Sequence, residues 1–298
     1  MTSDLLAAFS DSLADAVAVG APSVVQVQGG RRPASGLVYA DNVVVTTVRT
    51  LGREDNLHVR RDDGATLDAE LAGWDPTTSL AVLRVEGLGA SPAVPASAPP
   101  RVGHLALAIG RSWSNVVTAS AGIVAVIGGP LRTGRGRAIE QVLRTTAPVH
   151  DGFSGGALVD TKGALLGVTT STAIRGTTVV IPAGIAWKTA ATVLEHGSLK
   201  RGYIGVSAQT VTLPEGQRAG DRDSALLAVG VTAGGPAAAA GLLVGDIITE
   251  LDGQPVVSAE DLFDLLSGDR VGRRISLRVL RGGDSRELPV TVGERPKG

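Results

Sequence analysis

From residue 23 to residue 180 the sequence is a series of short apolar runs, rich in β-branched residues and separated by Gly, Pro, Asp or Asn. Runs of this length with turn residues between them are typical of strands in barrels or sandwiches, and they do not alternate with helices as βαβ units do. The sequence therefore predicts a mostly β fold. The expected strands are Ser23–Gly29, Leu37–Tyr39, Val43–Thr47, Leu57–Arg60, Ala81–Val85, Leu105–Ile109, Gly122–Ile127, Ala157–Val159 and Leu165–Thr170.

Three segments have helical character instead. Ser3–Val17 repeats apolar residues at the spacing of one helix face, and Ile185–His196 lacks Gly and Pro. Ala259–Leu266 follows Ser258, whose hydroxyl suits an N-cap. Gly197 after the second helix suits a C-cap. We therefore expect two domains, residues 1–197 and residues 198–298, the second with strands around Leu226–Val231, Ile247–Leu251, Ile275–Leu280 and Arg286–Val292.

The composition argues against several classes of function. Aromatic residues make up only 3% of the chain, so its cores must be aliphatic, and a net charge of −1 gives no general attraction to nucleic acid or to a membrane. The 298 residues include no cysteine and no HExxH, EF-hand or GxxxxGK[ST] motif. We expect no metal, no cofactor and no nucleic-acid partner.

The N-terminal segment leaves two locations open. Asp4, Asp11 and Asp15 interrupt its apolar residues, and no basic residue precedes them. These features argue against a signal peptide or a membrane anchor, so we expect a cytoplasmic protein without membrane contact. The alternative is an exported protein whose signal or anchor has been removed.

The stretch Gly152-Phe153-Ser154-Gly155-Gly156 is the most informative for chemistry. Glycines around a serine let the backbone turn sharply and let N–H groups converge, and converging N–H groups stabilise the oxyanion that forms in acyl transfer. The same string is also compatible with a plain glycine-rich turn.

Two further blocks give this serine a context. Val44–Leu51 resembles the pattern IVTNNHVV and Asp75–Leu83 resembles DPxTDLAVL. Together with the serine stretch, these blocks resemble the HtrA/Deg family of trypsin-like serine proteases over nearly the whole first domain. The resemblance implies a trypsin-like double β-barrel, a nucleophile at Ser154 and oxyanion donors on the backbone of Gly152 and Ser154. It also puts Arg49 where the family has its general-base histidine, and Ser79 where it has the orienting aspartate.

These two replacements predict a loss of catalysis. A serine hydroxyl needs a neighbouring base to take its proton, and arginine offers no acceptor lone pair. Serine at position 79 brings no negative charge to stabilise an imidazolium. His150 is a weak substitute base, because in this fold the base comes from the other barrel; Asp151 is a possible partner for His150 or Arg49. On this interpretation Ser154 is the relic of a protease turn.

The second domain resembles a PDZ domain. Arg201-Gly202-Tyr203-Ile204-Gly205-Val206 is similar to the carboxylate-binding loop of the family's PDZ modules, and Gly235–Ile248 to their second hallmark. The resemblance implies an α+β domain that adds a peptide to a sheet edge, with the peptide carboxylate in the N–H groups of Tyr203, Ile204 and Gly205. The strand from Val206 and the helix Ala259–Leu266 would select the peptide side chains, and Arg201 would add charge attraction. The alternative is a strand start without a ligand.

Three functions follow. The first is an inactive pseudoprotease that binds peptides or the C-termini of unfolded proteins through its PDZ domain. The second is an active serine endopeptidase that uses Ser154 with a non-standard base, and the third is an assembly protein that associates with itself through the PDZ domain. By resemblance, the partners include other copies of the chain in a trimer, or an active homologue.

Overall fold

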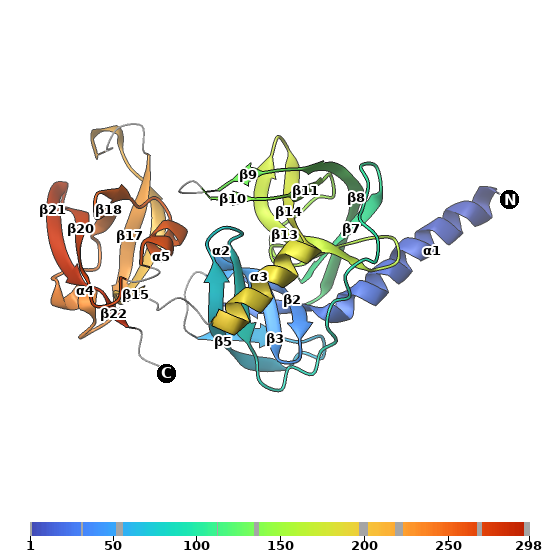
Figure 1. The fold of residues 1–298 in the computed structure, drawn as a ribbon, viewed down its shortest axis with the longest axis horizontal. Coiled ribbons are helices and arrows are strands. Elements are labelled where there is room, and N and C mark those ends of the chain that lie inside the picture. Colours follow the sequence, from blue (N-terminus) through green and yellow to red (C-terminus); the bar gives the residue numbers. More distant parts are fainter. Residues whose placement is uncertain are drawn as a thin grey trace. The chain divides into compact units, whose positions relative to one another are not determined.

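A computed structural model describes residues 2–30, 32–51, 56–111, 113–133, 137–196, 202–217, 223–266 and 270–294. The chain divides into two compact units, Met1–Gly197 and Ser198–Gly298 (Figure 1). The expected linker around Gly197 and Ser198 lies outside the described residues.

The first unit holds two closed β-barrels, which confirms the mostly β prediction. The first barrel has the strand order β1-β2-β3-β6-β5-β4 and the second has the order β11-β14-β13-β12-β7-β8. The strands of the first barrel are β1 Val24–Gln28, β2 Ala34–Ala40, β3 Val43–Thr47, β4 Leu57–Arg60, β5 Thr66–Asp75 and β6 Leu80–Arg84. Those of the second are β7 Leu105–Arg111, β8 Val117–Gly128, β11 Val142–Thr145, β12 Ala157–Val159, β13 Leu165–Ile174 and β14 Thr177–Pro182, with a hairpin of β9 Leu131–Arg132 and β10 Ala138–Ile139 beside them.

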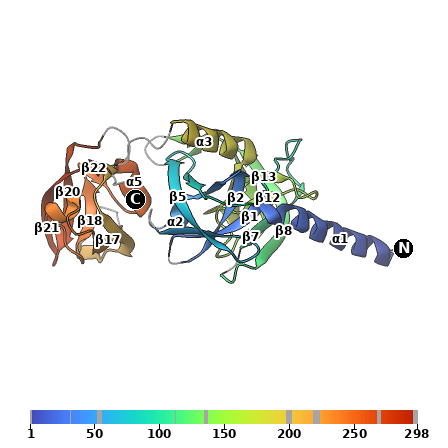
Figure 2. The same cartoon turned by 90° about the horizontal axis from the view of Figure 1, so that it is seen from below.

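Aliphatic side chains fill both barrels, as the low aromatic content requires. Helix α3 (Ala183–His196) packs against strands of both barrels (Figure 2). It carries Trp187, whose ring contacts that of Tyr39 in β2 edge-on, with 5.3 Å between the ring centroids. The predicted strand Val43–Thr47 is found as β3, and the short helix α2 (Val48–Leu51) directly follows it.

The N-terminal helix α1 (Thr2–Gly20) and the 3₁₀ turn η1 (Ala21–Ser23) lead into the first barrel. The end of α1 packs on the barrels through Leu13, Ala16 and Val17, whereas Leu5 near its start is 71% exposed. By length and composition alone, Asp4–Ser23 is long and apolar enough to cross a membrane. This finding runs against the expectation that the segment resembles neither a signal nor an anchor.

The second unit has the α+β composition expected of a PDZ domain. One sheet runs in the order β16-β17-β18-β20-β21, with β19 paired to β18, and β15 pairs with β22. Its strands are β15 Gly202–Tyr203, β16 Val206–Thr212, β17 Ser224–Val231, β18 Ile247–Leu251, β19 Gln254–Pro255, β20 Arg274–Arg281, β21 Asp284–Thr291 and β22 Gly293–Glu294; its helices are η3 Glu215–Gln217, α4 Pro236–Ala239 and α5 Ala259–Leu266. The Ser258 hydroxyl accepts the Asp261 N–H at 3.2 Å, so the predicted cap of α5 is confirmed.

Candidate active site and peptide-binding loop

The serine stretch forms a sharp turn between β11 and β12, and its glycines explain the sequence pattern. Gly152 and Gly155 have φ of +98° and +84°, a region that other residues rarely adopt. A Cβ on Gly155 would lie 2.1 Å from the carbonyl oxygen of Ser35, on strand β2 of the other barrel. Glycine is therefore required at these positions both by the backbone conformation and by the close approach of the two barrels.

Ser35 fixes this turn from the first barrel. Its N–H donates to the Ser154 carbonyl at 3.0 Å, and its hydroxyl donates to the Gly152 carbonyl at 2.6 Å. The same hydroxyl accepts the N–H of Arg111 at 2.8 Å. In the described part of the chain, the N–H groups of Gly152 and Ser154 donate no hydrogen bond. The carbonyls of Gly152 and Ser154 are thus hydrogen-bonded, whereas their N–H groups remain available to a ligand oxygen.

The side chain of Ser154 meets a hydroxyl. Its Oγ lies 3.1 Å from Oγ1 of Thr47, the last residue of β3. Either oxygen can donate this hydrogen bond, but a threonine hydroxyl is not a base that takes a proton near neutral pH. The contact that a triad would give to an imidazole is made here by a neutral alcohol.

The segments of Arg49 and Ser79, which the sequence analysis assigns to the other two triad positions, lie next to the segment that contacts Ser154. Arg49 lies in α2, two residues beyond Thr47, and its side chain is exposed. The N–H of Val48 donates to the Ser79 carbonyl at 2.9 Å, so α2 is attached to the turn that carries Ser79. Ser79 is a non-glycine residue with φ of +56°. The structure therefore brings the segments of Arg49, Ser79 and Ser154 together.

The alternative partners suggested by the sequence are not formed. The exposed His150 lies edge-on to the ring of Phe153, with 6.1 Å between centroids, whereas the Ser154 hydroxyl contacts Thr47. Asp151 forms an ion pair with Arg32, so the idea that it pairs with His150 or Arg49 is wrong.

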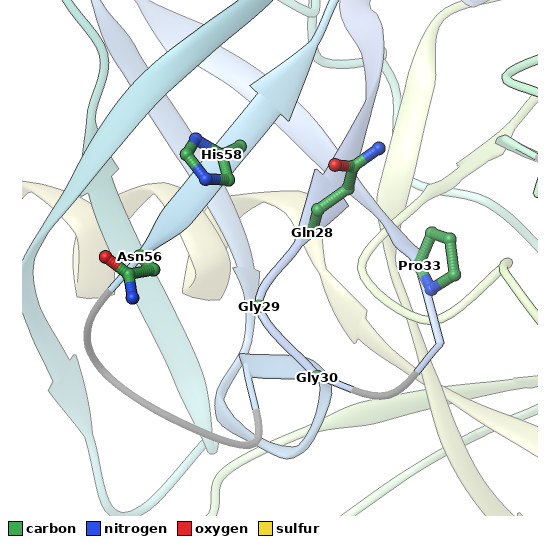
Figure 3. Close-up of a pocket in the computed structure, with 6 residues that line it drawn as sticks. All are labelled: Gln28, Gly29, Gly30, Pro33, Asn56 and His58. Carbon is green, nitrogen blue, oxygen red and sulfur yellow. The ribbon is translucent and has the colours of Figure 1, made fainter.

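A pocket of about 250 Å³ lies elsewhere in the first unit, between the end of β1 and the start of β4 (Figure 3). Its residue His58 is held by Asp68, with 3.0 Å between Nδ1 and Oδ1. No group of three or more His, Cys, Asp or Glu side chains within the described ranges is placed to hold a metal. The lining residues are Gln28, Gly29, Gly30, Pro33, Asn56 and His58.

The loop that precedes β16 has free donors of its own. The carbonyl of Ile204 accepts the N–H of Ala237 at 2.8 Å, and that of Gly205 accepts the N–H of Thr232 at 2.9 Å. Among the described residues, the N–H groups of Ile204 and Gly205 find no acceptor. Gly205 has φ of +77°, and the Ile204 side chain is buried. Arg201 lies outside the described residues.

Strand β16, which begins at Val206, offers an edge beside this loop. It lies at one end of the sheet, with β17 as its neighbour there, and α5 packs beside it. A free strand edge next to unpaired N–H groups is the arrangement that β-augmentation uses to bind a peptide and its terminal carboxylate.

Comparison with known protein families supports the fold of both units. The family model described as a trypsin-like peptidase domain matches residues 34–168, and that of a PDZ domain matches residues 202–292. The double barrel with its serine turn and the PDZ unit thus define a chain of the trypsin-like peptidase class with a C-terminal PDZ domain.

Curated relatives place the chain in a narrower group. The serine endoprotease DegS of Escherichia coli (strain K12) is 32% identical over 266 residues, which cover 85% of this chain and 74% of DegS. The chain belongs to the HtrA/Deg family, as the sequence motifs indicate. A probable periplasmic serine endoprotease, DegP-like, of Ectopseudomonas mendocina (strain ymp) is 32% identical over 289 residues; the match covers 93% of this chain but 60% of that relative.

Solved structures of similar proteins support the same family. The HtrA-type protease AlgW with decapeptide has a TM-score of 0.55 and 28% identity, with 96% of this chain and 99% of the other covered. The serine endoprotease from Yersinia pestis has a TM-score of 0.55 and 29% identity, with 95% and 98% covered.

Ser35 and Thr47 are site residues that the sequence analysis missed. Each contacts the serine turn across more than 100 residues of chain. Their contacts form only when the two barrels pack together, and neither residue is part of a recognisable motif in its own segment.

Proposed function

We propose that this chain is a catalytically inactive HtrA/Deg-family protein that binds peptides, or the C-termini of unfolded proteins, through its PDZ domain. The observation that carries the proposal is the 3.1 Å contact between the hydroxyls of Ser154 and Thr47. The family resemblance puts Arg49 at the base position of the same site. Neither group accepts the Ser154 proton, and loss of a triad base lowers turnover by about 10⁶-fold.

A repair experiment tests this reading. Ser79 has φ of +56°, which aspartate tolerates better than most residues, so Ser79→Asp fits the existing turn. We expect Arg49→His combined with Ser79→Asp to give casein cleavage and labelling by a fluorophosphonate, because the N–H groups of Gly152 and Ser154, the proposed oxyanion donors, make no other hydrogen bond among the described residues. The matched control adds Ser154→Ala to the same pair and must lose the gain. Ser154-dependent casein cleavage by the unmodified chain would contradict the proposal.

Peptide binding by the PDZ domain rests on the unpaired donors of Ile204 and Gly205 next to the free edge of β16. Gly205→Ala should weaken binding of peptides with a free C-terminus, because φ of +77° is strained for alanine and the new Cβ would lie 3.1 Å from the Tyr203 hydroxyl. Gly253→Ala is the matched control: its φ is +72°, but nothing lies within 4 Å of its Cβ. Equal binding by both variants would argue against this loop as the peptide site.

We also propose that the protein acts outside the cytoplasm. The support is the apolar helix α1, which passes the length and composition test for a membrane span, and the periplasmic relatives. This alternative is favoured over the cytoplasmic location expected from the sequence. Fractionation of cells that produce a tagged chain tests it, and recovery with cytosolic markers alone would contradict it.

Self-association in a homo-oligomer is a further part of the proposal. The support is the exposed apolar side chains at the start of α1, among them Leu5 and Phe9. Light scattering of the purified chain tests it, and a monomer over the whole concentration range would exclude it.

A further inference from the structure

We propose that the turn around Ser154 is a second ligand site, which takes the carboxylate at the end of an extended peptide. The N–H groups of Gly152 and Ser154 would hold the carboxylate, and Arg49 would supply the opposite charge. This inference rests on the proposed function, because it requires that the site does not cut the peptide. It adds a binding role for the inactive cleft to that of the PDZ loop.

The donors of this site are prepared before any ligand arrives. Ser35 occupies the carbonyls of both Gly152 and Ser154, at 2.6 and 3.0 Å, and Gly152 keeps its φ of +98°. Ser35 itself is fully buried, and its own carbonyl accepts the Thr46 hydroxyl at 2.7 Å. Donors held in this way lose little freedom on binding, so their hydrogen bonds favour the bound state.

The charge of the site favours an anion. The family pattern of a neutral histidine and an aspartate carries −1 at the two triad positions, whereas Arg49 and Ser79 carry +1. Arg49 is exposed and forms no ion pair within the described chain. The nearest carboxylate on the turn, Asp151, is already neutralised by Arg32. An arginine beside backbone donors is a strong partner for a carboxylate.

The hydroxyl of Ser154 also suits a carboxylate. A catalytic serine must lose its proton, but a serine paired with Thr47 keeps it and can donate it to a ligand oxygen. The turn therefore offers three donors, and Arg49 adds a cation two residues beyond Thr47, whose hydroxyl contacts Ser154. A peptide amide, which carries no charge, satisfies this arrangement less well than a free carboxylate.

The test is amide NMR of the full ¹⁵N-labelled chain, titrated with N-acetyl-Val-Ala-Val as its free acid and as its C-terminal amide. We expect the free acid to shift the amide signals of Gly152 and Ser154, and the amide form to do so at least about tenfold more weakly. Arg49→Gln should weaken the response of these two signals to the acid to a similar extent. Arg84→Gln, which removes an exposed arginine from β6 of the same barrel, is the matched control and should leave the response unchanged.

The same spectra separate this inference from the PDZ proposal, because Ile204 and Gly205 report on the other site. Shifts at Ile204 and Gly205 without shifts at Gly152 and Ser154 overturn the carboxylate site and leave the PDZ proposal intact. Equal shifts at Ser154 for acid and amide, or no effect of Arg49→Gln, also overturn it. The absence of shifts at both sites contradicts both proposals.

Discussion

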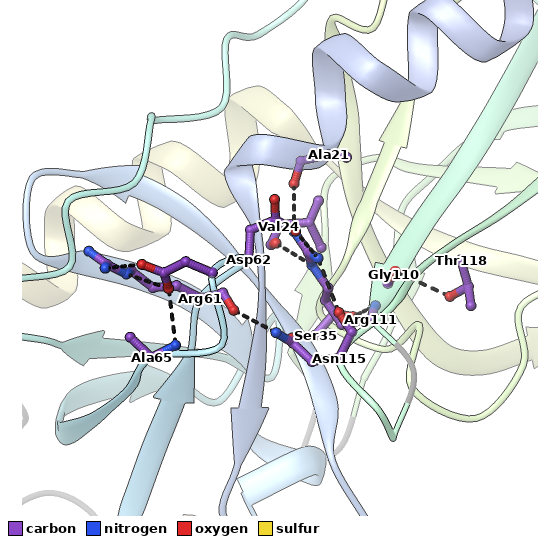
Figure 4. A network of polar contacts seen from close by, with 11 residues as sticks. Ala21, Val24, Ser35, Arg61, Asp62, Ala65, Gly110, Arg111, Asn115 and Thr118 are labelled. Atoms are coloured by element: carbon purple, nitrogen blue, oxygen red, sulfur yellow. Dashed lines mark hydrogen bonds and ion pairs between the residues drawn. The ribbon is translucent and has the colours of Figure 1, made fainter.

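Arg111 is the most buried charged side chain of the first unit, and its removal gives a prediction that can be worked out from its contacts. The side chain is 2% exposed. Figure 4 shows the network of polar contacts around it. Its Nε donates to the Val24 carbonyl at 2.8 Å, and its Nη1 donates to the Asn115 carbonyl at 3.2 Å and to Asp62 at 2.6 Å. Arg111 thereby ties the start of β1 to the loop between β7 and β8.

The cost of Arg111→Met follows from these partners. Asp62 is 76% exposed, so water replaces the guanidinium there, and the ion pair contributes about 1 kcal/mol or less. The carbonyls of Val24 and Asn115 lie inside and lose a donor, and each buried unsatisfied acceptor costs about 1–3 kcal/mol. For the two carbonyls together, we expect the free energy of unfolding of the first unit to fall by about 2–6 kcal/mol.

Tryptophan fluorescence during urea unfolding measures this quantity for the first unit alone, because Trp74, Trp113 and Trp187 are the three tryptophans of the chain. Arg84→Met removes an exposed arginine of the same unit and should change the unfolding free energy by no more than about 0.5 kcal/mol. A loss below about 1 kcal/mol for Arg111→Met would refute the assignment of the cost to the two carbonyls.

Two other predictions concern the serine turn and the PDZ unit. Gly155→Ala should destabilise the first unit by more than about 2 kcal/mol in the same assay, because its Cβ would lie 2.1 Å from the Ser35 carbonyl at φ of +84°; a loss of a few tenths would show that the barrels can move apart. The hydrogen bonds from Arg281 lower the pKa of Asp246 against the opposing effect of burial, so this carboxylate stabilises the PDZ unit above its unfolded pKa of about 3.9 and the gain is lost as pH falls through the lower folded value. Hydrogen exchange should therefore show the stability difference between the parent and Asp246→Asn shrinking below about pH 4, and a difference constant with pH would contradict this origin.

Much of the fold could be predicted because its signals are local. The apolar runs gave β1, β3 and β12 to within two residues, and Ser258 marks the start of α5. Strand β5 (Thr66–Asp75) was missed, although Leu67, Ala69 and Leu71 alternate with polar residues. Two of the polar residues, Asp68 and Glu70, are charged, and the strand is only partly buried. The alternation was the signal that would have found it.

The site could be predicted only in part. Glycines around Ser154 and the two family blocks located its segments, since backbone conformation and close approach restrict those positions. The contacts that decide the chemistry were not predictable, because Thr47 meets Ser154 only when one barrel pairs with the other. The partner of Asp151 is Arg32 for the same reason. The exposure of the first turns of α1 likewise depends on where the helix leaves the barrels.

The most direct test compares peptide-bond cleavage in an unfolded substrate by the unmodified chain and by its Ser154→Ala variant, followed by mass spectrometry of the products. The Ser154 hydroxyl contacts the hydroxyl of Thr47, which is not a base, and the family resemblance puts Arg49 where the histidine would be, so the two chains should give the same background. Faster cleavage by the unmodified chain, at a rate that rises with its concentration, would show that a base reaches Ser154 and would contradict the account.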